Sequence, residues 1–164
     1  IIGITEALAA QDIYELGERV EPFILAEGTR MGHIHLSVKD SRKSSQFYQK
    51  VLGLEDKFRV PSASWIAAGN YHHHLAVNEW GGKSLAPRKP GLPGLAYYVI
   101  EVAHKEELLM IAERAQEIDA PVKWLTSSQL DVTDPDGIVT RIRLARWARC
   151  DKNQRINCRK YPLS

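Results

Sequence analysis

Five of the six histidines in the chain gather in two short stretches, and their imidazoles are the first candidates for chemistry. His33 and His35 alternate with Ile34 and Leu36, so an extended strand would place both rings on one face. A run of three further histidines occupies positions 72–74. Imidazole transfers protons near neutral pH and is a common metal ligand. The two stretches therefore predict a proton-handling or metal-binding site wherever the fold brings them together.

The direction in which the histidine run points depends on strand register. If His73 shares a face with Leu75 and Val77, then His72 and His74 lie on the opposite face, and a shift of one residue exchanges the two sets. Consecutive histidines are also compatible with an ordinary polar strand. Two histidines from the same structural unit of the chain can also capture Zn(II), Ni(II) or Cu(II) weakly without being catalytic.

A strand, a helix and three further strands are predicted around these histidines. Residues 34–38 alternate as a strand. Asp40 or Ser41 can cap the helix that follows, and Gly53 suits the position after its last turn. Further strands are predicted at 55–60, 63–68 and 71–78. The order of elements is β-α-β-β-β.

The same order is predicted a second time, after a linker rich in Pro, Gly and basic residues. The opening strands of the two units align with His33 on Tyr97 and Leu36 on Ile100. This internal repeat predicts an α+β fold in which two β-α-β-β-β modules pair, with the helices outside and the inner sheet faces forming a cup. The predicted parts are a leader or connector at 1–30, a first module at 31–82, a linker at 83–93, a second module at 94–146 and a basic tail at 147–164.

Composition and charge are those of a soluble globular protein, with 44% hydrophobic and 26% charged residues and a formal net charge of +2. The basic residues from Arg146 to Lys160 favour a solvated tail over a nucleic-acid arm, because no stacking motif accompanies them. Cys150 and Cys158 lie in this tail and favour free thiols of a cytoplasmic protein over a disulfide. No apolar run approaches the roughly 20 residues that a membrane span needs.

Several segments resemble the vicinal oxygen chelate superfamily, which includes glyoxalase I, bleomycin-resistance proteins and extradiol ring-cleaving dioxygenases. The resemblance extends from about residue 5 to 146 and is greatest to the C-terminal half of tandem catechol-2,3-dioxygenase-type proteins. The leader resembles the connector between the halves of such proteins. Together with a first residue that is not Met, it favours a chain that belongs to a longer polypeptide with an N-terminal half. The segments that carry the resemblance are MGHIHLSV, SSQFYQKVLGL, YHHHLAVNEW, PGLAYYVIEV and LDVTDPDG.

The resemblance implies a small-molecule site in the cup. In extradiol-type members two histidines and one carboxylate hold Fe(II) or Mn(II), and the oxygens of a catechol chelate the metal. His33 matches the first ligand. His74 matches the position of a ligand in glyoxalase-like members and of a proton-handling histidine in extradiol-like ones, and a register shift would give that role to His72.

Two of the three implied ligands are replaced in this chain. Tyr97 stands where the second histidine is expected, and Arg141 stands where the carboxylate is expected after the DPDG turn. An arginine cannot ligate a cation, because its guanidinium has no available lone pair. Glu101 cannot substitute for Tyr97, because four strand residues separate them by roughly 13 Å.

Two functions of different classes follow. The first is an extradiol-type enzyme that uses Fe(II) or Mn(II), with activity in this half or in an N-terminal half of the same polypeptide. The second is a metal-free module in which His35, Tyr97 and Arg141 hold an anionic or phenolic ligand through charge-assisted contacts. The sequence leaves open which of the two applies, and it also leaves open a homo-oligomer.

Overall fold

The computed structural model describes residues 7–17, 22, 24–25, 29, 31–82, 84–86, 91 and 93–145. The basic tail at 147–164 and its two cysteines lie outside the described residues, as does part of the linker at 83–93. In the leader, α1 (Ala10–Leu16) buries none of its side chains. None of the helices in the described part of the chain is both long and apolar enough to cross a bilayer.

The first module forms one four-stranded sheet covered by one helix. Its strands have the spatial order β1-β4-β3-β2, in which β1 runs parallel to β4 and the other neighbours are antiparallel. The helix begins where the Asp40 carboxylate accepts the backbone N–H of Lys43 at 2.9 Å, and it ends at Gly53, whose φ of 70° suits glycine. The elements are β1 (Ile34–Ser37), α2 (Ser41–Leu52), β2 (Glu55–Val60), β3 (Ala63–Ala67) and β4 (Leu75–Asn78).

The second module repeats this arrangement with the spatial order β5-β8-β7-β6. Its helix begins after His104, whose backbone N–H donates to the Glu107 carboxylate at 2.9 Å, so the sixth histidine of the chain lies at a helix start. The elements are β5 (Tyr98–Val102), α3 (Lys105–Gln116), β6 (Val122–Thr126), β7 (Gln129–Thr133) and β8 (Val139–Leu144). The predicted α+β fold of two β-α-β-β-β modules is confirmed.

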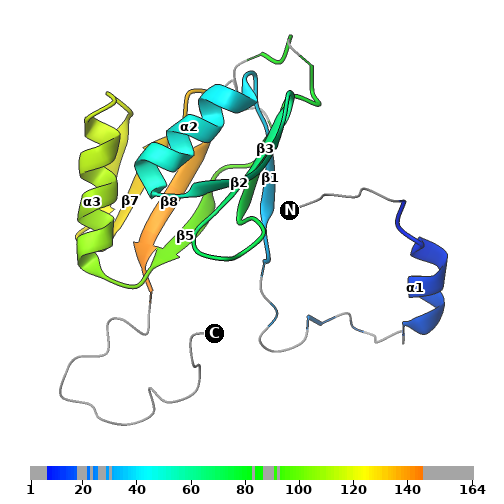
Figure 1. The fold of residues 1–164 in the computed structure, drawn as a ribbon. Coiled ribbons are helices and arrows are strands. Elements are labelled where there is room, and N and C mark those ends of the chain that lie inside the picture. Colours follow the sequence, from blue (N-terminus) through cyan, green and yellow to red (C-terminus); the bar gives the residue numbers. More distant parts are fainter. Residues whose placement is uncertain are drawn as a thin grey trace.

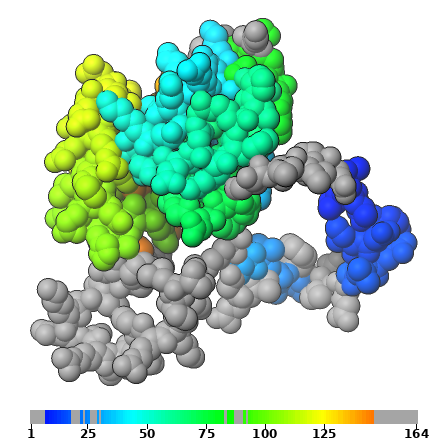
Figure 2. Space-filling model, in the orientation of Figure 1, coloured from blue at the N-terminus to red at the C-terminus, as the bar shows by residue number. Residues whose placement is uncertain are grey.

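One apolar core runs through both modules. Figure 1 shows α2 and α3 side by side, each against the sheet of its own module. Leu36 of β1 and Val77 of β4 belong to this core in the first module, and Leu108 of α3 and Ile142 of β8 belong to it in the second. Figure 2 shows the surface of α2 in cyan against that of α3 in yellow-green. The strand residues in between, including His35, therefore lie on the sheet faces turned away from the helices.

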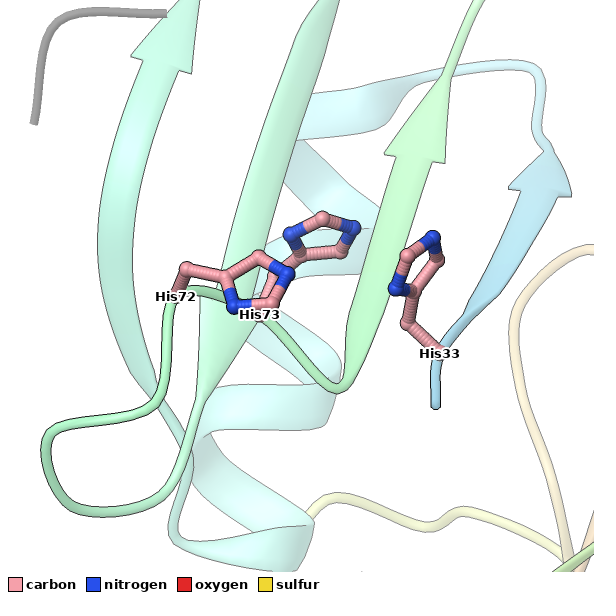
Figure 3. A group of neighbouring side chains, drawn as sticks. All are labelled: His33, His72 and His73. Atoms are coloured by element: carbon pink, nitrogen blue, oxygen red, sulfur yellow. The ribbon is translucent and has the colours of Figure 1, made fainter. Parts of the chain in front are cut away.

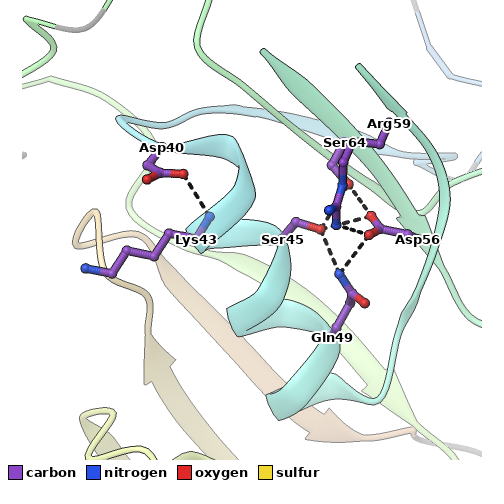
Figure 4. Close-up of polar contacts among 7 residues, drawn as sticks. All are labelled: Asp40, Lys43, Ser45, Gln49, Asp56, Arg59 and Ser64. Carbon is purple, nitrogen blue, oxygen red and sulfur yellow. Dashed lines mark hydrogen bonds and ion pairs between the residues drawn. The ribbon is translucent and has the colours of Figure 1, made fainter. Parts of the chain in front are cut away.

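A polar cluster holds α2 on its sheet (Figure 4). The Asp56 carboxylate at the start of β2 accepts hydrogen bonds from Ser45 Oγ at 3.0 Å and from Gln49 Nε2 at 3.1 Å, both on α2. Arg59 and Ser64 also donate to this carboxylate. Ser45 and Ser64 are buried and bonded to each other, so the cluster satisfies polar groups inside the module and takes these serines out of consideration as free nucleophiles.

The DPDG turn at 134–137 fastens the two modules together. Asp134 accepts a hydrogen bond from the hydroxyl of Tyr48 on α2 at 2.7 Å. Asp136 accepts the backbone N–H of Lys39 at 3.0 Å and the hydroxyl of Ser44 at 2.9 Å. Burial raises the pKa of the Asp134 carboxyl above its usual value. We call these three contacts the inter-module clasp.

Candidate functional site

The candidate site lies where two strands begin. β1 pairs with β4 in parallel with Ile34 opposite Leu75, and the Ile34 N–H donates to the His74 carbonyl at 3.1 Å. Parallel pairing places the starts of both strands at the same edge of the sheet. The residues just before each strand therefore meet, and Figure 3 shows His33 on one side and His72 and His73 on the other.

His33, His72 and His73 form a group that we call the histidine cluster. One ring nitrogen from each lies within 4.8 Å of the others. The ring centroids of His33 and His73 are 4.2 Å apart, and those of His33 and His72 are 5.8 Å apart. His33 and His72 are exposed and His73 is half-buried, so the cluster is open to solvent on one side.

His35 extends the cluster through one direct contact. Its Nε2 lies 3.3 Å from the Nε2 of His73, so one ring donates and the other accepts according to their tautomers. Its ring also lies 5.4 Å from that of His33 and 6.3 Å from that of Trp80. His35 is thus a neighbour of the cluster rather than one of its three members.

His74 points elsewhere. Its Nδ1 accepts the backbone N–H of Ala68 at 3.3 Å, and its ring lies 4.7 Å from that of Tyr71. Residues 71–74 precede β4, so the strand alternation used in the sequence-based expectation does not apply to them, and it is His73 rather than His74 that lies with His33 and His72. His72 lies in the cluster as expected, although the proton-transfer role of either residue stays a prediction.

The surroundings lower the pKa of three of these histidines. Burial first, and then the neighbouring rings of His33 and His72, lower the pKa of His73 to about 4. Burial and then His33 lower the pKa of His35, and burial and then His72 lower that of His74. A neutral imidazole has a free lone pair, so rings with a lowered pKa are ready to bind a cation at neutral pH.

Tyr97 and Arg141 lie together in the second module. The Arg141 guanidinium stacks 3.7 Å above the centre of the Tyr97 ring and donates two hydrogen bonds to Asp131, at 2.8 and 2.9 Å. Arg143 forms a more exposed ion pair with one carboxylate oxygen of Glu101, at 2.8 Å. Both carboxylates are therefore occupied, and the positive charge of Arg141 is balanced.

These residues do not fit the metal triad that the resemblance implies. Within the part of the chain that the structure describes, no carboxylate joins the histidine cluster, and the contacts of Arg141 run to Asp131 and Tyr97. The cluster itself fits a metal better. Nitrogens on a tetrahedral zinc lie about 3.3 to 3.4 Å apart, so the present spacing has to close by up to ~1.5 Å, within reach of exposed side chains.

A cavity also lies at the seam between the modules, away from the histidines. It has a volume of about 370 Å³ and is lined by residues that include Phe47, Ile118 and Asp134. Its exposed wall area is mostly apolar, and Asp134 of the inter-module clasp is part of its lining.

Sequence reasoning did not foresee that His73 would join His33. The signal was present in the order of elements, because the first and fourth strands of such a module are neighbours in the sheet. Once β1 and β4 are paired in parallel, the residues before each strand are brought together whatever their alternation.

Comparisons with known proteins agree with this fold. The family model of the Glyoxalase/Bleomycin resistance protein/Dioxygenase superfamily matches residues 30–142. A catechol-2,3-dioxygenase of Bacillus subtilis (strain 168) is 35% identical over 113 residues, which are 68% of this chain and 39% of that protein. The chain thus spans about two fifths of the length of this relative.

Solved structures show the same architecture at lower identity. A glyoxylase/bleomycin resistance protein/dioxygenase domain from Frankia sp. EAN1pec has a TM-score of 0.56 at 21% identity, covering 72% of this chain and 98% of that one. Lactoylglutathione lyase from Agrobacterium tumefaciens has a TM-score of 0.54 at 18% identity, covering 73% and 96%. The fosfomycin resistance protein FosX from Listeria monocytogenes has a TM-score of 0.51 at 18% identity, covering 71% and 93%.

Proposed function

Since this chain belongs to the Glyoxalase/Bleomycin resistance protein/Dioxygenase superfamily, we propose that it binds a catechol-like small molecule at a divalent metal held by His33, His72 and His73. The observation that carries the proposal is the approach of three ring nitrogens to within 4.8 Å of one another at one open edge of a sheet. A bound metal supplies Lewis acidity there, which favours ionised oxygens on a chelating ligand.

The class of small molecule is suggested by the relative named catechol-2,3-dioxygenase. Around the cluster, His35 and Trp80 offer an imidazole and an indole on the same side of the sheet. These groups suit a flat phenolic ligand, since the indole supplies an apolar surface and the imidazole a hydrogen bond. Extradiol ring cleavage with Fe(II) or Mn(II) is the finer form of this function, and the missing carboxylate weighs against it.

The test is metal binding by purified protein stripped with a chelator. Zn(II), Fe(II) and Mn(II) are added separately, and bound metal is measured after gel filtration, followed by catechol titration and oxygen uptake. We expect one metal per chain, and loss of that metal in His33→Ala. His104→Asn is the matched control, because it removes a histidine outside the cluster and keeps a side chain suited to a helix start.

The outcomes separate the two levels of the proposal. Absence of bound metal in the native chain contradicts the metal-dependent function altogether. Metal and catechol binding without oxygen uptake leaves chelation as the function and excludes ring cleavage by this chain.

A second candidate is a metal-free module that holds a phenolic or anionic ligand on the second module. The stacked pair of Arg141 and Tyr97 favours it, since a guanidinium over an aromatic ring is a platform for planar ligands. Asp131 weakens it by balancing the charge of Arg141. Catechol binding that survives chelator and is lost in Tyr97→Ala would support this candidate. Loss of binding on chelation would exclude it.

A further inference from the structure

We propose that the histidine cluster is a carboxylate-free, three-imidazole site for Zn(II), Co(II), Ni(II) or Cu(II), in which His35 is a positioning residue that fixes His73 as a ligand. This inference rests on the proposed metal binding at the same cluster. It adds the class of ion and a role for a histidine that does not itself reach the centre of the cluster.

The class of ion follows from the donors. Three neutral imidazoles leave the full charge of a divalent ion uncompensated, and no carboxylate of the described residues joins them. Imidazole suits zinc, copper and nickel, whereas Mn(II) and Mg(II) favour carboxylate and water. The general order of affinity along the first row points the same way, with Mn(II) weakest. The site is therefore expected to bind the later ions in preference to manganese.

The role of His35 follows from the tautomer of His73. A neutral imidazole has one N–H and one lone pair, on different nitrogens. Its Nε2 faces the Nε2 of His35 at 3.3 Å. When His73 donates from Nε2 to His35, its lone pair lies on Nδ1 and is free for a cation. When the donation runs the other way, the proton lies on Nδ1 instead and His73 cannot ligate through that atom.

The position of His35 supports a positioning role over ligation. Ligating histidines generally donate their second ring N–H to a fixed acceptor, and loss of the acceptor lowers metal affinity. His35 contacts His73 directly but does not belong to the group whose nitrogens are mutually within 4.8 Å. It follows Ile34 and precedes Leu36 on β1, so its backbone is held by the pairing with β4. His35 is thus a fixed acceptor beside a ligand that comes from a loop.

The experiment compares the native chain with His35→Phe and His35→Gln. Phenylalanine keeps a ring but has no acceptor, whereas the glutamine amide oxygen can accept from His73. Zn(II) and Mn(II) affinities are measured by competition with a chromophoric chelator. The absorption bands of the Co(II)-loaded protein report the geometry and number of nitrogen ligands. Circular dichroism confirms that each variant is folded, which is expected because His35 is exposed.

We expect Zn(II) to bind more tightly than Mn(II), His35→Phe to weaken Zn(II) by about 10- to 100-fold, and His35→Gln to restore most of the affinity. The Co(II) spectrum should keep its intensity in His35→Gln and change in His35→Phe.

Three results would each contradict a different part of the inference. If the native chain binds no metal, both the proposed function and this inference are contradicted. Metal binding with equal affinity in all three proteins removes only the role of His35. A preference for Mn(II) removes only the proposed class of ion.

Discussion

At the residue scale, protons and metal ions compete for the histidine cluster. Each ring that gains a proton makes protonation of its neighbours less favourable, and this adds to burial in lowering the pKa of His73 to about 4 in the folded chain. An unfolded histidine has a pKa near 6.5. The folded state therefore binds fewer protons than the unfolded state between these two values.

A pH dependence of stability follows for the metal-free protein. Because the pKa of His73 is lower in the folded state, its contribution is fully present above pH 6.5 and is lost as the pH falls toward 4. We expect the thermal midpoint to fall between pH 7 and pH 5, and to fall less in His73→Gln. Calorimetry on both proteins in the same buffers checks this, and equal slopes would contradict it.

At the element scale, the inter-module clasp fixes the first module against the second through hydrogen bonds to Asp134 and Asp136. Tyr48 is fully buried and donates to a buried carboxylate that follows β7, so one hydroxyl joins α2 to the opposite module. The Asp136 carboxylate binds the start of the same helix. The DPDG motif, which the family resemblance treats as a marker for a metal carboxylate, thus holds the fold together.

Removing the Tyr48 hydroxyl should be costly. Tyr48→Phe leaves the Asp134 carboxylate short of one donor in a buried place, and we expect a loss of about 1–3 kcal/mol in the free energy of unfolding. Urea denaturation measures the change. Lys50→Met is the control, because it removes an exposed pair with Glu117 at 3.9 Å, which should contribute at most about 1 kcal/mol. A Tyr48→Phe effect no larger than this control would contradict the clasp.

The pair of Arg141 and Asp131 belongs to the same scale, since it ties β8 to β7. Both side chains are largely covered, with 21% and 14% of their surfaces exposed. Arg141→Met leaves Asp131 without its bidentate partner, and we expect a loss of about 2 kcal/mol in unfolding free energy. The double variant with Asp131→Leu should recover part of it. Urea denaturation of the three proteins checks the order, and an unchanged Arg141→Met would contradict it.

The pair of Arg141 and Asp131 also affects the expected result of a double substitution that the sequence suggests. Restoring the implied ligands by Tyr97→His with Arg141→Glu is expected from the sequence to raise metal affinity. The structure adds that the carboxylate introduced at position 141 would face Asp131 without a cation between them, which is destabilising. We expect this double variant to be less stable than the native chain in the absence of metal and to regain stability with added Mn(II). Thermal melts with and without the ion test this, and a melt that Mn(II) leaves unchanged would show that the second module supplies no ligands.

At the scale of the whole molecule, the fold was largely readable from local pattern. Alternation predicted the strands, and Asp40 and Gly53 marked the ends of α2, because caps act within a few residues. The repeated order of elements then indicated two like modules. Family membership, predicted from the same segments, is confirmed.

The candidate site was less predictable, because it depends on contacts between distant residues. His33 and His72 were singled out by type, but the contact of His73 with His33 needs the pairing of β1 with β4 and a loop without alternation. The ion pair of Arg141 likewise depends on strand pairing, which places Asp131 opposite Arg141 on the neighbouring strand. The roles of His35 and Tyr97 are addressed by the tests above. The proton-transfer role of His74 and the two proposed partners, an N-terminal half of the same polypeptide and a second copy of the chain, stay predictions.

The side-by-side starts of β1 and β4 also make the cluster a removable cross-link. An ion shared by His33 and His73 would join two points of the chain that enclose β1, α2, β2 and β3. Cross-links stabilise mainly by restricting the unfolded chain. Free metal at a hundred times its dissociation constant would add about 2.7 kcal/mol. The stability of the first module would then depend on the concentration of free metal, and its resistance to proteases would increase as that concentration increases.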